Sequence, residues 1–202
     1  MINKVEILAS AKKTLLSESE SIANLVNYLD DDFAKAVEII YNTKARVVVT
    51  GIGKSAIIAA KIVASLNSTG TPSLFLHAAE AIHGDLGMVQ PGDVVICISK
   101  SGNSPEIKVL VPLLKRFGNT LIGMTANKDS FLGKGSDLVL NAYVATEADP
   151  NNLAPTNSTT AQLALGDALT VCLIEMRGFK SEDFARYHPG GALGKKLLLR
   201  VG

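Results

Sequence analysis

The chain has little of several features that mark particular classes of protein. It contains two cysteines and no tryptophan among 202 residues, and its formal net charge is only +1. A nearly neutral chain lacks the basic surface with which proteins hold nucleic acids or anionic membranes. Cys97 and Cys172 both lie inside apolar runs, where a thiol behaves as a small hydrophobic group in a reducing compartment. We therefore expect a cytoplasmic protein with a small-molecule partner, no nucleic acid and no membrane.

Long apolar runs are also absent. No stretch approaches the roughly 18 apolar residues that a membrane-spanning helix needs, and residues 1–13 lack the apolar core of a signal peptide. No internal repeat, low-complexity segment or linker composition divides the chain. With 202 residues it is long enough for one sizeable α/β domain, so we expect residues 1–202 to form one domain.

What the chain does have is an alternation of helical and strand-like patterns. Residues 1–42 carry apolar side chains at helical spacing, such as Phe33, Val37 and Ile40, and are predicted to form helices. Short runs rich in valine and isoleucine predict strands at residues 46–50, 73–76, 94–98, 120–124 and 138–140. Further helices are predicted at residues 55–66, 105–117 and 159–176.

This order of elements predicts the fold class. Strands that alternate with helices, joined by right-handed crossovers, form a parallel sheet with helices on both faces. The predicted strands lack polar alternation, which is typical of strands buried on both sides. We therefore expect an α/β fold with a doubly wound, flavodoxin-like, five-stranded parallel sheet, whose ligand lies beyond the carboxyl ends of the strands.

The stretch VVICISKSGNSPEI places a polar loop at one such strand end. We call residues 99–104 the serine loop. Ser104 is predicted to cap the next helix, with Pro105 at its first position. The free N–H groups of that helix then point at Ser99 and Ser101, and Gly102 lets the backbone fold closely around a ligand. Such a loop suits a phosphate, although an ordinary capped turn is the alternative.

Two further polar loops end strands or begin helices: VVVTGIGKS, up to Ser55, and LAPTNSTT, before the predicted helix at residues 159–176. Three polar loops at one edge favour a binding site that includes Gly53, Ser55 and Thr159. A P-loop is rejected for GIGKS because its first glycine would fall on Val48. GIGKSA also fits a dinucleotide-binding G-x-G-x-x-A, but the strand at 73–76 ends without an acidic residue, so a nicotinamide cofactor stays a minor alternative.

Charged side chains near these loops are candidates for chemistry, and each has a simpler alternative. Lys54 at the positive end of a helix favours an anionic ligand over a merely solvated role. Glu106 is otherwise a partner of a helix dipole, and Glu147 a solvated loop residue. His83 and His188 stand beside glycines. A metal site formed by histidines with Asp85 matches no known ligand spacing, so we expect no metal.

Five stretches, in this order, closely resemble the sugar isomerase (SIS) domain of the arabinose 5-phosphate isomerases: GIGKSA, STGTPSLFLHAAEAIHGDLGMV, ISKSGNSPEI, LAPTNSTTAQLALGDAL and ARYHPGGALGKKLL. They cover nearly the whole chain. AEAIHGDLGMV and HPGGALGKKLL separate this branch from phosphosugar synthases and transcriptional regulators that share only the serine loop. The resemblance implies a homotetramer that interconverts D-ribulose 5-phosphate and D-arabinose 5-phosphate without a cofactor, for the synthesis of Kdo in lipopolysaccharide or capsule.

The resemblance also implies roles for individual residues. Lys54, Glu106, Glu147 and His188 fall on active-site positions of that family, Ser99, Ser101 and Ser104 on its phosphate loop, and His83 on a signature loop near the site. The helices within residues 1–42 are then expected to pack on neighbouring subunits as well as on the domain. Because the catalytic carbons lie some distance from the phosphate, His188 or Glu147 is favoured over Glu106 as the proton-transfer base.

Two departures from the family accompany this resemblance. Its members commonly continue into a pair of regulatory CBS modules, whereas this chain stops at Gly202, so we expect no CBS module within it. Asp149 stands where many relatives have cysteine.

The alternative function is a sensor that binds a phosphosugar without catalysis. A further expectation is feedback inhibition at the isomerase site by CMP-Kdo, the activated form of the acidic sugar Kdo.

Overall fold

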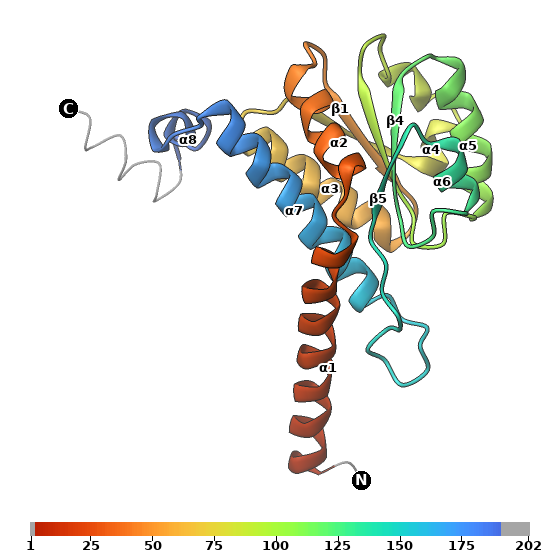
Figure 1. The fold of residues 1–202 in the computed structure, drawn as a ribbon, viewed down its shortest axis with the longest axis vertical. Coiled ribbons are helices and arrows are strands. Elements are labelled where there is room, and N and C mark those ends of the chain that lie inside the picture. Colours follow the sequence, from red (N-terminus) through yellow and green to blue (C-terminus); the bar gives the residue numbers. More distant parts are fainter. Residues whose placement is uncertain (1–2, 191–202) are drawn as a thin grey trace.

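The computed structural model describes residues 3–190 and contains a five-stranded sheet (Figure 1). Its strands are β1 (Val47–Gly51), β2 (Ser73–His77), β3 (Val94–Ile98), β4 (Thr120–Thr125) and β5 (Leu138–Asn141). Every pair of neighbouring strands is parallel, and the order across the sheet is β2-β1-β3-β4-β5. All five strands predicted from the sequence are present, with small shifts at their ends.

Helices connect and flank these strands. The long ones are α1 (Lys4–Asn24), α2 (Asp31–Asn42), α3 (Lys54–Ser68), α5 (Pro105–Arg116) and α7 (Asn157–Arg177). Shorter helices are η1 (Leu25–Tyr28), α4 (Ala78–Ala81), η2 (Asp85–Met88), α6 (Phe131–Gly135) and α8 (Ser181–Tyr187). The three predicted helices after the first strand correspond to α3, α5 and α7. No helix within residues 3–190 is long and apolar enough to cross a bilayer.

Two apolar cores cover the two faces of the sheet. One core packs α2, α3 and α7 against a face that includes Val49 and Ile96. The other packs α4, α5 and α6 against the opposite face, which includes Val48 and Val95. Consecutive residues of one strand therefore serve different cores, as the period of a strand requires. The expected doubly wound arrangement is confirmed.

The strand order determines where a ligand can enter. β1 and β3 are neighbours in the sheet, yet β2 lies between them in sequence on the outer side of β1. The chain thus turns in opposite directions after β1 and after β3, which opens a crevice at their carboxyl ends. This order is that of the flavodoxin-like fold and differs from the six-stranded order of the dinucleotide-binding fold. The nicotinamide alternative therefore loses its support.

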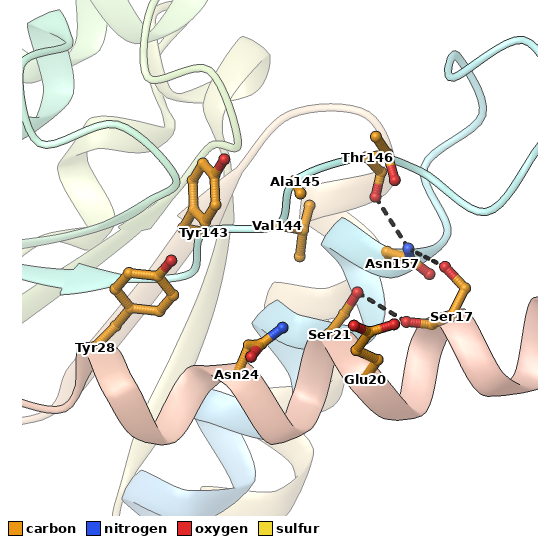
Figure 2. A pocket seen from close by; sticks show the side chains of 10 residues that line it. All are labelled: Ser17, Glu20, Ser21, Asn24, Tyr28, Tyr143, Val144, Ala145, Thr146 and Asn157. Carbon is orange, nitrogen blue, oxygen red and sulfur yellow. Dashed lines mark hydrogen bonds between the residues drawn. The ribbon is translucent and has the colours of Figure 1, made fainter.

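Helix α1 extends away from the sheet at the edge where the strands end (Figure 1). Its residues Leu8, Leu15 and Ile22 are spaced by seven and are 50%, 68% and 40% exposed. At 100° per residue they lie opposite Ser17 and Asn24, which face the body of the chain (Figure 2). The predicted helices of the amino-terminal segment are confirmed, but α1 has an apolar face that no other part of residues 3–190 covers.

Candidate functional site

The serine loop follows β3 and is held by its own side chains. The hydroxyl of Ser99 accepts the N–H of Gly102 at 3.2 Å, and the hydroxyl of Ser101 accepts the N–H of Asn103 at 3.2 Å. Ser104 is the residue before α5, as predicted, but its side chain makes no capping hydrogen bond. The prediction of a side-chain cap was therefore wrong, and the buried hydroxyl is left without a hydrogen-bond partner among the described residues.

Gly102 fixes the shape of this loop. Its φ is +64°, in the left-handed region that favours glycine, and a Cβ there would overlap Oγ and Cβ of Ser130. Its carbonyl accepts the N–H of Leu132 at 2.9 Å. The close approach of the serine loop to the start of α6 therefore requires a residue without a side chain.

The GIGKS segment lies next to the serine loop, because Gly51 pairs with Ile98 across β1 and β3. Gly53 has a φ of +58° and stands before α3, so that the exposed Lys54 is the first residue of this helix. The hydroxyl of Ser55 donates to Gln162 Oε1 of α7 at 3.2 Å. The GIGKS loop is thereby connected to α7, the helix that follows the LAPTNSTT loop.

Glu147 connects the LAPTNSTT loop, before α7, to the serine loop. It lies between β5 and α7, and its side chain is only 2% exposed. Lys100 Nζ of the serine loop is 2.6 Å from its Oε1. Its Oε2 accepts the N–H groups of Thr156 at 2.9 Å and Ser158 at 3.1 Å. The alternative of a solvated loop residue is therefore wrong, and the expected convergence of the three loops is confirmed.

The ionisation of Glu147 follows from these contacts. Burial alone would raise the pKa of this carboxyl, but hydrogen bonds from Lys100, Ser158 and Thr156 outweigh burial and lower the pKa to about 2. The carboxylate thus stays charged throughout the neutral range. A group with this pKa accepts a proton weakly at neutral pH, which suits a positioning role better than that of a general base.

The effect of acid on stability tests this network. The folded pKa of Glu147 lies below its ordinary value of 4.5, so its contribution is present above about pH 4.5 and is lost as the pH falls toward about 2. That contribution is about 3 kcal/mol at neutral pH. We expect Glu147→Gln to lower the free energy of unfolding at neutral pH and to flatten its decline in acid, measured by urea unfolding.

Asp129→Asn provides the control, because the Asp129 side chain is 91% exposed. This variant should follow the wild-type stability curve across the same pH range. A Glu147→Gln curve that declines in acid as steeply as the wild-type curve would contradict the stabilising role of the ionised carboxylate.

The remaining candidates lie in three different places. Glu106 is the second residue of α5 and half-buried, and Thr159 lies in the first turn of α7. His83 is exposed on the turn between α4 and η2. His188 follows α8, with its ring stacked on Phe184 at 3.8 Å between centroids. Lys54, Glu106 and Thr159 thus begin helices at the edge where the strands end.

His188 lies at the opposite edge of the sheet in the same chain. Gly70, in the turn that leads into β2, lies against the ring of Phe179 and near the hydroxyl of Tyr187. Figure 1 shows α8 at the end of α7 that is remote from the loop before α7. The 21 residues of α7 span about 30 Å. One chain therefore does not bring His188 to the three loops.

A pocket of about 280 Å³ lies next to the residues that precede Glu147 in the sequence (Figure 2). It lies between α1 and the segment 143–146, and its ten lining residues include no lysine or arginine. Asn157 Nδ2 donates to Ser17 Oγ at 2.8 Å and to the carbonyl of Thr146 at 3.0 Å. The pocket thus does not suit a phosphate, but its wall fixes the residues that precede Glu147 and Ser158.

Comparison with known proteins agrees with this arrangement. The sequence model of the SIS domain matches residues 39–172. The chain belongs to the SIS domain family. Among proteins with this domain, an arabinose 5-phosphate isomerase, KdsD, of Pseudomonas aeruginosa is 52% identical over 100% of this chain and 62% of its own length. An arabinose 5-phosphate isomerase, KpsF, of Escherichia coli is 50% identical over 96% of this chain and 60% of its own.

A solved SIS structure is similarly close in shape. A protein of Escherichia coli CFT073, determined in complex with arabinose 5-phosphate, is 40% identical and superposes with a TM-score of 0.90, covering 93% of this chain and 100% of that chain. The present chain spans about 60% of the length of the curated relatives that it matches. The resemblance inferred from the motifs is confirmed at the level of the family. The end of the HPGGALGKKLL motif, from residue 191, lies outside the described residues.

Sequence reasoning missed two members of this SIS site. Lys100 was not singled out, although a lysine between two serines of an anion-binding loop was a visible signal. Gln162, 1% exposed, reaches Ser55 from the second turn of α7, and nothing in the local sequence indicates that contact. Within residues 3–190, no three His, Cys, Asp or Glu side chains group as metal ligands.

Proposed function

We propose that this chain is an aldose-ketose isomerase that interconverts D-ribulose 5-phosphate and D-arabinose 5-phosphate, supplies Kdo synthesis and acts in the cytoplasm. The observation that carries the proposal is the 40% identity and full coverage of a structure that holds arabinose 5-phosphate. The arabinose 5-phosphate isomerases at about 50% identity support the same reaction. The two cysteines are free, which fits a reducing compartment.

The serine loop is the proposed phosphate site. Ser104 presents a buried hydroxyl without a partner, and α5 presents its free N–H groups in the same place. Gly53, Ser55 and Thr159 line the neighbouring loops, and Ser99 and Ser101 hold the loop while they border the anion. Lys54 adds a cation at the start of α3. In this proposal the phosphate lies at the crevice between β1 and β3.

Isomerisation requires a proton to leave C1 of the ketose and a proton to return to C2. The electrons of the broken C–H bond form an enediolate, and the hydroxyl proton of O1 is lost as O2 becomes protonated. Lys54 is proposed to stabilise the oxyanion, Glu106 to orient hydroxyls, and His188 to open the sugar ring or transfer the proton. Glu147, with its low pKa and occupied oxygens, holds the loops in position.

His188 can serve this reaction only from another subunit, because its own chain holds it at the far edge of the sheet. The exposed apolar residues of α1, Leu8, Leu15 and Ile22, recur every seven positions, as in helices that pack side by side between chains. We include a homotetramer in the proposal, in which neighbouring chains complete each site, with His83 near it. A monomer by light scattering at working concentration would overturn this part.

Incubation of the purified chain with D-ribulose 5-phosphate tests the activity. NMR should show D-arabinose 5-phosphate, and in D₂O deuterium should appear at C2 because the transferred proton exchanges with solvent. The alternative is an SIS domain that binds a phosphosugar as a sensor. Binding of D-arabinose 5-phosphate with no conversion would favour that alternative, since a sensor needs the phosphate site but not Lys54, Glu106 and His188.

Ser104→Ala is expected to raise KM with little change in kcat. One charge-assisted hydrogen bond to the phosphate is worth roughly tenfold or more in affinity, and it is present in the ground state as well as the transition state. Steady-state kinetics with D-ribulose 5-phosphate measures both constants. Lys108→Ala, on the exposed face of α5, is the control and should change neither. A kcat that falls with KM unchanged would contradict the phosphate role of Ser104.

Feedback by CMP-Kdo is the remaining part of the proposal. Its phosphate and carboxylate would compete with substrate for the serine loop and Lys54. Competitive inhibition, with a higher apparent KM and unchanged kcat, is expected. No inhibition at concentrations well above the substrate KM would contradict it.

A further inference from the structure

A buried negative charge lies beside the proposed phosphate site. The Glu147 side chain is 2% exposed, and its Oε1 is 2.6 Å from Lys100 Nζ. Because Lys100 belongs to the serine loop, the carboxylate is no farther from the backbone of that loop than the length of a lysine side chain. Salt does not fully screen charges at this separation, since the Debye length is about 8 Å at physiological ionic strength. An uncompensated carboxylate there would oppose the binding of a phosphate dianion.

The contacts of Lys100 show how that opposition is removed. Its carbonyl accepts the N–H of Ala126 at 3.0 Å and the hydroxyl of Thr125 at 3.1 Å, which fixes the loop backbone against the end of β4. Its side chain leaves the loop and meets Glu147 in front of α7. The amides of Thr156 and Ser158 hold the other carboxylate oxygen. Lys100 therefore provides the positive charge that pairs with Glu147.

We propose that Lys100 is a positioning residue for phosphate recognition: its ammonium neutralises the buried Glu147 carboxylate beside the serine loop. It acts through Glu147 and the loop and does not itself contact the phosphate. This inference rests on the proposed function, because the anion concerned is the phosphate of the phosphosugar. It assigns to the pair a role in substrate affinity that is separate from proton transfer.

Lys100→Met tests the proposal. The variant leaves the charge of Glu147 uncompensated, so KM for D-ribulose 5-phosphate should rise about tenfold or more, with a smaller change in kcat. The Kd of inorganic phosphate, measured by calorimetry, should rise by a similar factor. Lys115→Met is the matched control, because Lys115 pairs with Asp137 and has the same 42% side-chain exposure. This control should leave KM and the phosphate Kd unchanged.

The double variant Lys100→Met/Glu147→Gln separates neutralisation from direct contact. With both charges removed, KM and the phosphate Kd should return to within a few fold of the wild-type values. The readouts here are KM and the phosphate Kd, because the proposal concerns binding and not proton transfer. A double variant that binds phosphate as weakly as Lys100→Met would show that Lys100 does not act by neutralising Glu147 and would overturn the proposal. An unchanged KM in Lys100→Met would also overturn it.

The phosphate measurement keeps this inference separate from the proposed function. Calorimetry with inorganic phosphate needs no turnover and applies to all four proteins. A wild-type chain that binds phosphate and shows the expected pattern without isomerising D-ribulose 5-phosphate would refute the proposed activity alone. A wild-type chain that isomerises, with no effect of Lys100→Met on KM or phosphate affinity, would refute this inference alone.

Discussion

His188→Ala is expected to lower turnover of D-ribulose 5-phosphate at least about a hundredfold, the low end for the loss of an acid-base group. The fold should remain intact, because His188 follows the last residue of α8 and, within residues 3–190, its ring contacts Phe184, by stacking and through Nδ1 at 2.9 Å from the Phe184 carbonyl. Circular dichroism and urea unfolding measure the fold, and steady-state kinetics measures kcat. Near-normal turnover in this variant would remove His188 from the proposed mechanism.

Mixing inactive variants tests whether His188 acts between subunits. Lys54 begins α3 at one edge of the sheet, and His188 lies beyond α8 at the other, so one chain does not unite them. If neighbouring chains do, a mixture of Lys54→Ala and His188→Ala chains forms some sites with both native residues. Random assembly of equal amounts restores about a quarter of wild-type activity.

The control for this experiment is a mixture of Lys54→Ala with Lys54→Met chains, which can form no native site and should stay inactive. The chains must be unfolded and refolded together, so that subunits exchange fully. Activity no higher than the control would show that Lys54 and His188 do not meet across an interface. Because a single chain also keeps the two residues apart, this result would argue against a catalytic role of His188.

Much of the fold was predictable because the strands are buried on both faces. Runs such as Val94–Ile98 have no polar alternation, and each is followed by a helical pattern, which together indicate a parallel sheet. The short helix α6, Phe131–Gly135, was not predictable, because two of its five residues are glycines, which disfavour helix. The helix is stabilised at its start by Ser130, whose Oγ accepts the N–H of Gly133 at 3.1 Å.

The site was predictable only as a set of loops. Strand ends that meet at one edge place the serine loop, Lys54 and the start of α7 together, whichever side chains they carry. The burial of Glu147 depends on Lys100, which is 47 positions away in the sequence. The remote position of His188 depends on the length and direction of α7. Both follow from tertiary packing, and no local pattern records them.

Gly102→Ala is expected to lower the free energy of unfolding by about 2–4 kcal/mol, through crowding added to a strained backbone. The residue has a φ of +64°, and the new Cβ would overlap Ser130, whose Oγ holds the N–H of Gly133 at the start of α6. The serine loop must move to relieve this overlap, so KM for D-ribulose 5-phosphate should also rise at least about tenfold. Urea unfolding and steady-state kinetics measure the two effects.

Gly118→Ala is the matched control, because Gly118 also has a positive φ, +74°, but nothing lies within 4 Å of the position of its Cβ. It therefore introduces the backbone strain without the overlap and should lower the free energy of unfolding by about 1 kcal/mol. Its KM should equal that of the wild type, since residue 118 follows the end of α5 far from the serine loop. Equal losses of stability in the two variants would show that contact with Ser130 does not determine the shape of the phosphate site.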